Sequence, residues 1–201
     1  MPASLYPTSR RIQFLQLFTI VWMTCEAGAS LLAAWRARSP ALLAFGGDSL
    51  IELLSASVVF WRFSVRTTSE QAEHRAARIA GVLLFFLGAY VVVLSVLALL
   101  GYSAPKPSLL GICVLVAGAI VMPLLAREKR KLSASTGSAT LRADAVQSGL
   151  CGYLALIALG GLAINFLWRM GFADSLAALA IVPFIIREAR EAMSGKPCSC
   201  A

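Results

Sequence analysis

Charged residues are scarce in this sequence. They make up 14% of its 201 residues, against roughly 25% in soluble globular domains, whereas hydrophobic residues make up 59%. The mean hydropathy, +0.78, is correspondingly high. This shortage of charge excludes a soluble domain and predicts an integral, multi-pass protein of the lipid bilayer.

Several residue patterns that particular activities require are also missing. The sequence has one histidine, no Gly-x-Ser-x-Gly motif and no nucleotide-binding loop, so we expect no enzymatic activity and no cofactor. The net charge of +8 comes from basic clusters, but these lack the interleaved aromatic side chains of a base-stacking surface. We therefore expect no nucleic-acid partner.

Six long apolar segments are present. Each is close to the ~20 residues with which a helix crosses the hydrocarbon core of a membrane. They cover residues 13–35, 40–63, 78–101, 108–126, 143–167 and 171–187. The predicted fold is an all-α membrane protein, with a six-transmembrane-helix bundle in residues 1–190 and a short cytoplasmic tail in residues 191–201.

The segments between the apolar runs give further expectations. Residues 132–138 are small and polar, which predicts a flexible linker. Residues 67–78 are charged and favour helix, which predicts that the third span extends into the cytoplasm. The first span exceeds the ~7–15 apolar residues of a signal-peptide core, so we expect it to be retained.

The distribution of basic residues predicts the orientation. With the N-terminus in the cytoplasm, fourteen of the 18 Lys and Arg residues lie on the cytoplasmic side, including Lys129 among the cluster at residues 127–131. The remaining four, outside, are Arg36, Arg38, Lys106 and Arg169. The positive-inside rule therefore favours both termini in the cytoplasm.

Two acidic residues interrupt the second apolar run. Asp48 and Glu52 are four residues apart, so both project from one face of a helix and can reach a single ion. A charged acid at the centre of a membrane helix costs at least ~2.5 kcal/mol on insertion scales, and such residues usually mark a functional site. A divalent cation, or a proton, is the simplest compensation.

The fifth apolar run offers a facing pair, Gln147 and Cys151, with the same spacing. Taken alone, these residues also fit ordinary helix packing. At ~1.5 Å per residue, Glu52 should lie about 18 Å below the outer face and Cys151 about 12 Å above the inner face. In a core of ~30 Å these depths coincide, which predicts that the two pairs meet.

Three segments of the sequence resemble the cation diffusion facilitator (cation efflux) family. Residues Ser39 to Glu52 and Leu141 to Cys151 are similar to its second and fifth helices, and Phe172 to Ile181 to the start of its sixth. The resemblance implies export of divalent metal, typically zinc, from the cytosol in exchange for protons, usually by a homodimer. It also implies a transport site with two ligands on helix two and two on helix five.

Carried over to this sequence, the metal ligands are Asp48, Glu52, Gln147 and Cys151. Gln147 stands where the family most often has His or Asp, and Cys151 where it has Asp. Two carboxylates, a thiolate and an amide oxygen suit zinc, cadmium or another borderline-soft ion better than magnesium or calcium. The substituted helix-five pair also leaves an alternative, a non-transporting metal-binding protein that modulates another transporter.

The sequence departs from the family at its end as well. The resemblance implies a C-terminal cytoplasmic metal-binding domain, which we do not expect in this chain. The tail instead carries Cys198 and Cys200, which could capture metal on the reducing cytoplasmic side or be incidental. Two ligands alone make an incomplete metal site.

The remaining intramembrane acids have weaker interpretations. Glu26 could line the cation route or serve the structure. Asp174 could mark metal exit or cap a helix, and for Asp144 we expect a capping role at the entry of the fifth helix.

Together these features predict transport by alternating access with proton antiport, because metal displaces protons from carboxylates at a shared site. The transported metal is then substrate and not cofactor. We expect the protein in the bacterial inner (plasma) membrane, with an organelle's membrane as the alternative.

Overall fold

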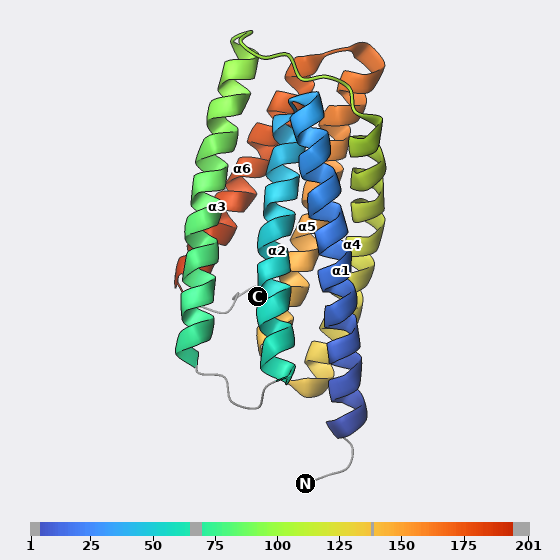
Figure 1. The fold of residues 1–201 in the computed structure, drawn as a ribbon, viewed down its shortest axis with the longest axis vertical. Helices are drawn as coiled ribbons and strands as arrows, with labels where there is room; N and C mark the ends of the chain where they lie inside the picture. The colour runs from blue at the N-terminus through green and yellow to red at the C-terminus, as the bar shows by residue number, and fades with distance from the viewer. Residues whose placement is uncertain (1–4, 65–69, 138, 195–201) are drawn as a thin grey trace.

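The computed structural model describes residues 5–64, 70–137 and 139–194, which form six α-helices and, within these ranges, no strand (Figure 1). The helices are α1 (Leu5–Ala37), α2 (Pro40–Ser64), α3 (Glu70–Leu99), α4 (Leu109–Thr136), α5 (Ala139–Trp168) and α6 (Gly171–Ser194). The predicted all-α, six-helix fold is confirmed.

The helices form a ring of four with a pair packed on one side. In the ring, α1 contacts α2, α2 contacts α5, α5 contacts α4 and α4 contacts α1. The pair α3 and α6 packs against this ring, with α6 touching both α2 and α5. Helix α2 thus contacts four others, α1, α3, α5 and α6, and its polar residues face the interior of the bundle.

Both chain ends lie toward the same end of the bundle. The first residues of α1 and the last residues of α6 point to the lower end in Figure 1. An even number of helices that alternate in direction produces this arrangement. That both termini lie in the cytoplasm stays a prediction.

Local capping signals explain the limits of α2 and α4. Pro40 is the first residue of α2, a position where its missing N–H costs no helical hydrogen bond. The Ser108 hydroxyl accepts a hydrogen bond from the Gly111 N–H at 3.1 Å and starts α4. Gly137, with φ of 66°, ends α4 in the left-handed conformation that glycine tolerates.

Helices α4 and α6 are longer than the apolar runs that predicted them. Residues 132–136 belong to α4, so the predicted flexible linker is wrong there, because the charged segment after the apolar run continues to favour helix until Gly137 stops it. Helix α6 extends to Ser194, four residues into the predicted tail. The extension predicted for the third span is confirmed, since α3 begins at Glu70.

Within the described residues, four helices are long and apolar enough to cross a membrane. They are α1 (residues 11–37), α3 (78–99), α4 (109–136) and α5 (144–168). The other two, α2 and α6, carry buried acids and pack against members of this set. The chain is an integral membrane protein.

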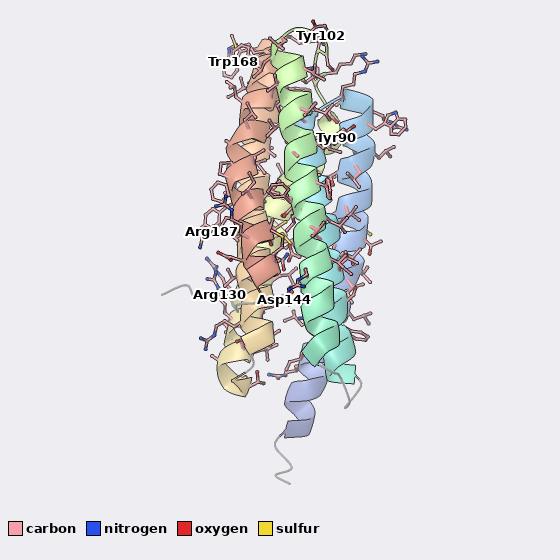
Figure 2. The ribbon with its side chains drawn as sticks, turned by 90° about the vertical axis from the view of Figure 1, so that its left-hand side faces the viewer. Tyr90, Tyr102, Arg130, Asp144, Trp168 and Arg187 are labelled. Atoms are coloured by element: carbon pink, nitrogen blue, oxygen red, sulfur yellow. The ribbon has the colours of Figure 1, made fainter. Side chains whose placement is uncertain are left out.

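The outer surface of the bundle suits a bilayer. Phe85, Phe86 and Tyr90 of α3 expose half or more of their surface, as expected of side chains that face lipid. Tyr102 and Trp168 lie near one end of the bundle (Figure 2), where aromatic side chains usually meet the membrane interface.

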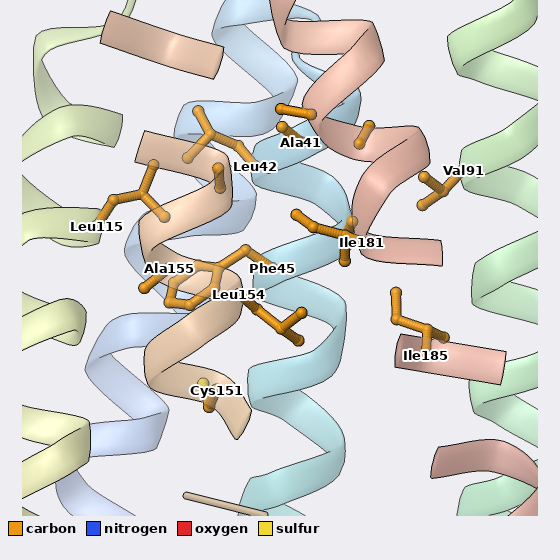
Figure 3. Packing of buried hydrophobic residues seen from close by; sticks show 14 of the residues in the cluster. Ala41, Leu42, Phe45, Val91, Leu115, Cys151, Leu154, Ala155, Ile181 and Ile185 are labelled. Atoms are coloured by element: carbon orange, nitrogen blue, oxygen red, sulfur yellow. The ribbon is translucent and has the colours of Figure 1, made fainter. Parts of the chain in front are cut away.

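The interior above the polar region is closely packed. Phe45, Leu115, Leu154 and Ile181 belong to one buried cluster that joins α2, α4, α5 and α6 (Figure 3). A Cβ on Gly161 would lie 2.4 Å from the Cβ of Ala177, so the missing side chain lets α5 and α6 approach closely.

Candidate cation site

Asp48 and Glu52 lie deep in the bundle on α2. Their relative exposures are 2% and 0%, and α2 is enclosed by α1, α3, α5 and α6. Among the described residues, Asp48 Oδ1 and Glu52 Oε2 have no hydrogen-bond partner. Each acid therefore has one buried oxygen that can still bind a cation.

The fifth-helix residue Cys151 meets Glu52. Cys151 is fully buried, and its thiol lies close enough to the Glu52 carboxylate and the Ser49 hydroxyl to interact with both. The two residues that the depth calculation placed at one level are thus in contact. Figure 3 places Cys151 at the edge of the apolar cluster, below Phe45 and Leu154.

Gln147 takes part in a different contact. Its side chain lies close enough to the carboxylate of Glu188 on α6 to interact with it, and Glu188 also lies close to Asp48. The structure therefore links Gln147 to Asp48 through Glu188. A ligand role for Gln147 stays a prediction.

A buried polar network surrounds the other side of Glu52. The Lys129 ammonium of α4 lies 3.0 Å from Asp144 Oδ2 and 3.9 Å from Glu52 Oε1, and it donates to Ser148 Oγ at 2.7 Å. Ser148 in turn donates to Glu52 Oε1, and Gln16 Nε2 donates to Asp144 Oδ2 at 2.7 Å. The network connects α1, α2, α4 and α5.

This network corrects two sequence predictions. Asp144 does not cap the entry of the fifth helix, because α5 begins five residues earlier, at Ala139, and Asp144 is buried in contact with Lys129 and Gln16. Lys129 is not a solvent-exposed cytoplasmic charge. It is the one fully buried basic side chain among the described residues. Helix α4 continues past its apolar run, which keeps Lys129 inside the bundle.

Glu26 of α1 lies close enough to couple electrostatically with Asp48 and Glu52. Its Oε2 accepts a hydrogen bond from Trp22 Nε1 at 2.7 Å, while Oε1 has no partner in the described part of the chain. A Cβ on Gly118 of α4 would lie 2.5 Å from that oxygen, so the glycine makes room for it. A role of Glu26 in the cation route stays a prediction.

Asp174 has a structural role at the end of the bundle where α2 and α6 begin. Its Oδ1 accepts a hydrogen bond from Ser39 Oγ at 2.7 Å, and its Oδ2 lies 3.5 Å from the donating Ala41 N–H. Asp174 thus binds the start of α2 from the first turn of α6. The contact resembles a cap, but it is made to the start of α2 and not to α6. A role of Asp174 in metal exit stays a prediction.

The described residues do not form a complete coordination shell for a metal ion. Among them, no group of three or more His, Cys, Asp and Glu side chains is spaced to hold a metal ion. Cys198 and Cys200 lie outside the described residues. Metal binding by Asp48, Glu52, Gln147 and Cys151 stays a prediction, for which the structure supplies two buried carboxylates beside a thiol.

Glu188 is not among the predicted site residues, because the sixth apolar run ends at residue 187. A signal was present: Ile181, Ile185 and Ala189 are buried, and residues three or four apart share a helix face. Glu188 follows Ile185 by three positions, so it lies toward the same interior face. Lys129 could have been found in the same way, by extending the fourth helix to its glycine stop.

Comparison with known proteins agrees with this arrangement. The model of the cation efflux transmembrane domain family matches residues 17–194, which include α1 from residue 17 onward and all of α2 to α6. A comparison with curated proteins found no significant match. Since the match covers most of the chain, and its buried acids lie inside a bundle of membrane helices, the chain belongs to the cation efflux transmembrane domain family and is a membrane cation transporter.

Proposed function

We propose that this transporter exports a divalent, borderline-soft metal ion, zinc or one of similar chemistry, from the cytoplasm in exchange for protons. The observation that carries the proposal is the pair Asp48 and Glu52, buried on α2 with an unpartnered oxygen each. Two such acids inside a membrane bundle require a cation or a proton to balance their charge.

The contact between Glu52 and Cys151 supports the choice of metal. A thiolate prefers zinc, cadmium and similar ions, whereas magnesium and calcium prefer oxygen ligands throughout. The Cys151 thiol lies beside the Glu52 carboxylate, and a metal that displaced the thiol proton would gain a sulfur and an oxygen ligand together.

Proton exchange follows from the same chemistry. Carboxylate and thiolate ligands must release their protons before they bind metal, so metal and protons compete for one site. Alternating access would present this site first to the cytoplasm and then to the outside. We further propose a homodimer in the bacterial inner membrane with both termini in the cytoplasm.

Metal flux in liposomes tests the transport proposal. With an imposed pH gradient, the protein should move zinc or cadmium, and Asp48→Asn should reduce the rate at least about tenfold, because loss of even a supporting group costs ~10–100-fold in metal affinity. Glu128→Gln is the matched control, since Glu128 is an exposed acid paired with Lys131 on the surface. Its flux should equal that of the wild type.

Two outcomes would contradict the proposal. Unchanged flux in Asp48→Asn would remove this residue from the transport site. Metal binding by the wild type without any flux would instead favour the alternative, a non-transporting metal-binding membrane protein.

The metal preference has its own test, in the substitution Cys151→Asp. Thermal stabilisation by zinc, cadmium, iron, manganese, cobalt, nickel and copper measures binding to the folded state. The substitution exchanges a soft ligand for a hard one, so stabilisation by cadmium should fall relative to stabilisation by manganese. Cys113→Ser, at an exposed position on α4, should leave the profile unchanged. An unchanged profile in Cys151→Asp would exclude the thiol from the site.

A further inference from the structure

Helix α6 brings a third carboxylate to the α2 pair. Glu188 lies close enough to both Asp48 and Gln147 for their side chains to interact. The contact joins α2, α5 and α6, three helices that pack on one another along their lengths. Helix α6 therefore contributes an acid to the group around Asp48, in addition to those of α2.

The charges around this contact are not balanced within the described residues. Lys129, the one fully buried basic side chain described, lies on the other side of Glu52 and is shared with Asp144. No ion pair is found for Asp48 or Glu188 in the described part of the chain. Two carboxylates in contact repel each other unless a cation or a proton lies between them.

A second observation points to a ligand at this position. Asp48 is 98% buried, since its exposure is 2%, and its Oδ1 has no partner among the described residues. An unpaired polar atom in the interior of a protein is costly. The atom lies on the residue that Glu188 contacts, so a bound cation would satisfy it.

Gln147 is placed to support Glu188. An amide N–H that donates to one carboxylate oxygen fixes the orientation of the group and leaves the other oxygen open to a metal. Such supporting donors commonly surround metal ligands. The contact also explains how the site tolerates an uncharged residue in this position of α5.

We propose that Glu188 is a metal ligand, which binds the transported cation together with Asp48, while Gln147 orients Glu188 and is not itself a ligand. This inference rests on the proposed function, since it assigns a further residue to the same cation. Asp48 of α2 and Glu188 of α6 supply two of the oxygen ligands. Glu52 and Cys151 complete the coordination shell when the helices close on the ion. The site thereby spans the ring of four helices and the α3–α6 pair.

Metal titration of the purified, full-length protein tests the assignment. Zinc and cadmium binding would be measured by isothermal titration calorimetry for the wild type, Asp48→Asn, Glu188→Gln and Glu191→Gln. Glu191 is the matched control, because it lies one turn further along α6 and pairs with Arg187 at 2.9 Å. Glu188→Gln and Asp48→Asn should each weaken binding at least about tenfold, and Glu191→Gln should not.

The outcomes separate the two proposals. If Asp48→Asn weakens binding and Glu188→Gln does not, the role of Glu188 is overturned and the proposed function stands. If the wild type binds neither zinc nor cadmium, both are overturned.

A spectroscopic measurement distinguishes a ligand from a structural residue. In a Cys151→Ser background, Glu188→Cys with bound cobalt should gain a sulfur-to-cobalt charge-transfer band in the near ultraviolet, because a thiolate would then bind the metal directly. Glu191→Cys in the same background should show no such band. Equal spectra for the two variants would exclude residue 188 from the coordination shell, even where Glu188→Gln folds poorly.

Discussion

At the scale of single residues, Lys129 is the side chain on which most of the buried network depends. It is fully buried, as is Glu52, while Asp144 is 1% exposed. Its ammonium balances the charge of the acids beside it and donates to Ser148. Removing one partner of a buried ion pair leaves an uncompensated charge, which is costlier than removing the whole pair.

Lys129→Met should therefore destabilise the protein by ~3–5 kcal/mol, seen as a lower midpoint of thermal unfolding in detergent. Lys131→Met is the control, because the pair of Lys131 with Glu128 is exposed and such pairs contribute only ~0–1 kcal/mol. The double variant K129M/D144N should recover part of the loss, since it removes a charge of each sign. Equal midpoints for Lys129→Met and Lys131→Met would contradict the network.

At the scale of helices, the sequence predicted the number of elements and the position of the α2 acids. Pro40 marked the start of α2, and the i, i+4 spacing of Asp48 and Glu52 placed both on one face. The regular rise of a helix was enough to bring Glu52 and Cys151 to one depth, and their contact confirms this.

The helix ends and the partners across helices could not be predicted in the same way. Apolar runs measure the part of a helix that lies in lipid, so they stop before α4 and α6 end. Lys129 and Glu188 follow those runs, and both lie in the bundle because helix continues beyond them. The pairing of Asp48 with Glu188 depends on the packing of α6 against α2, which a single sequence does not specify.

At the scale of the whole molecule, the two ends of the bundle differ in charge. Arg130 lies at the level of Asp144 in the lower half of the bundle, Arg187 lies near the middle, and Tyr102 and Trp168 lie near the upper end (Figure 2). Lys129 is buried and does not count among the surface charges. The end that holds Arg130 still carries more basic residues than the opposite end. By the positive-inside rule we expect that end to face the cytoplasm.

Cysteine labelling in intact cells tests this orientation. The two positions are Tyr102→Cys, where the native side chain is 79% exposed, and Lys131→Cys, where it is 72% exposed, each in a background without native cysteines. A membrane-impermeant maleimide should label the first from outside, and the second only after the membrane is opened. This pattern would place the end that holds Arg130 in the cytoplasm, which is the orientation that the proposed export of metal assumes. The reverse pattern would invert the transporter, and the proposed direction of metal movement would be wrong.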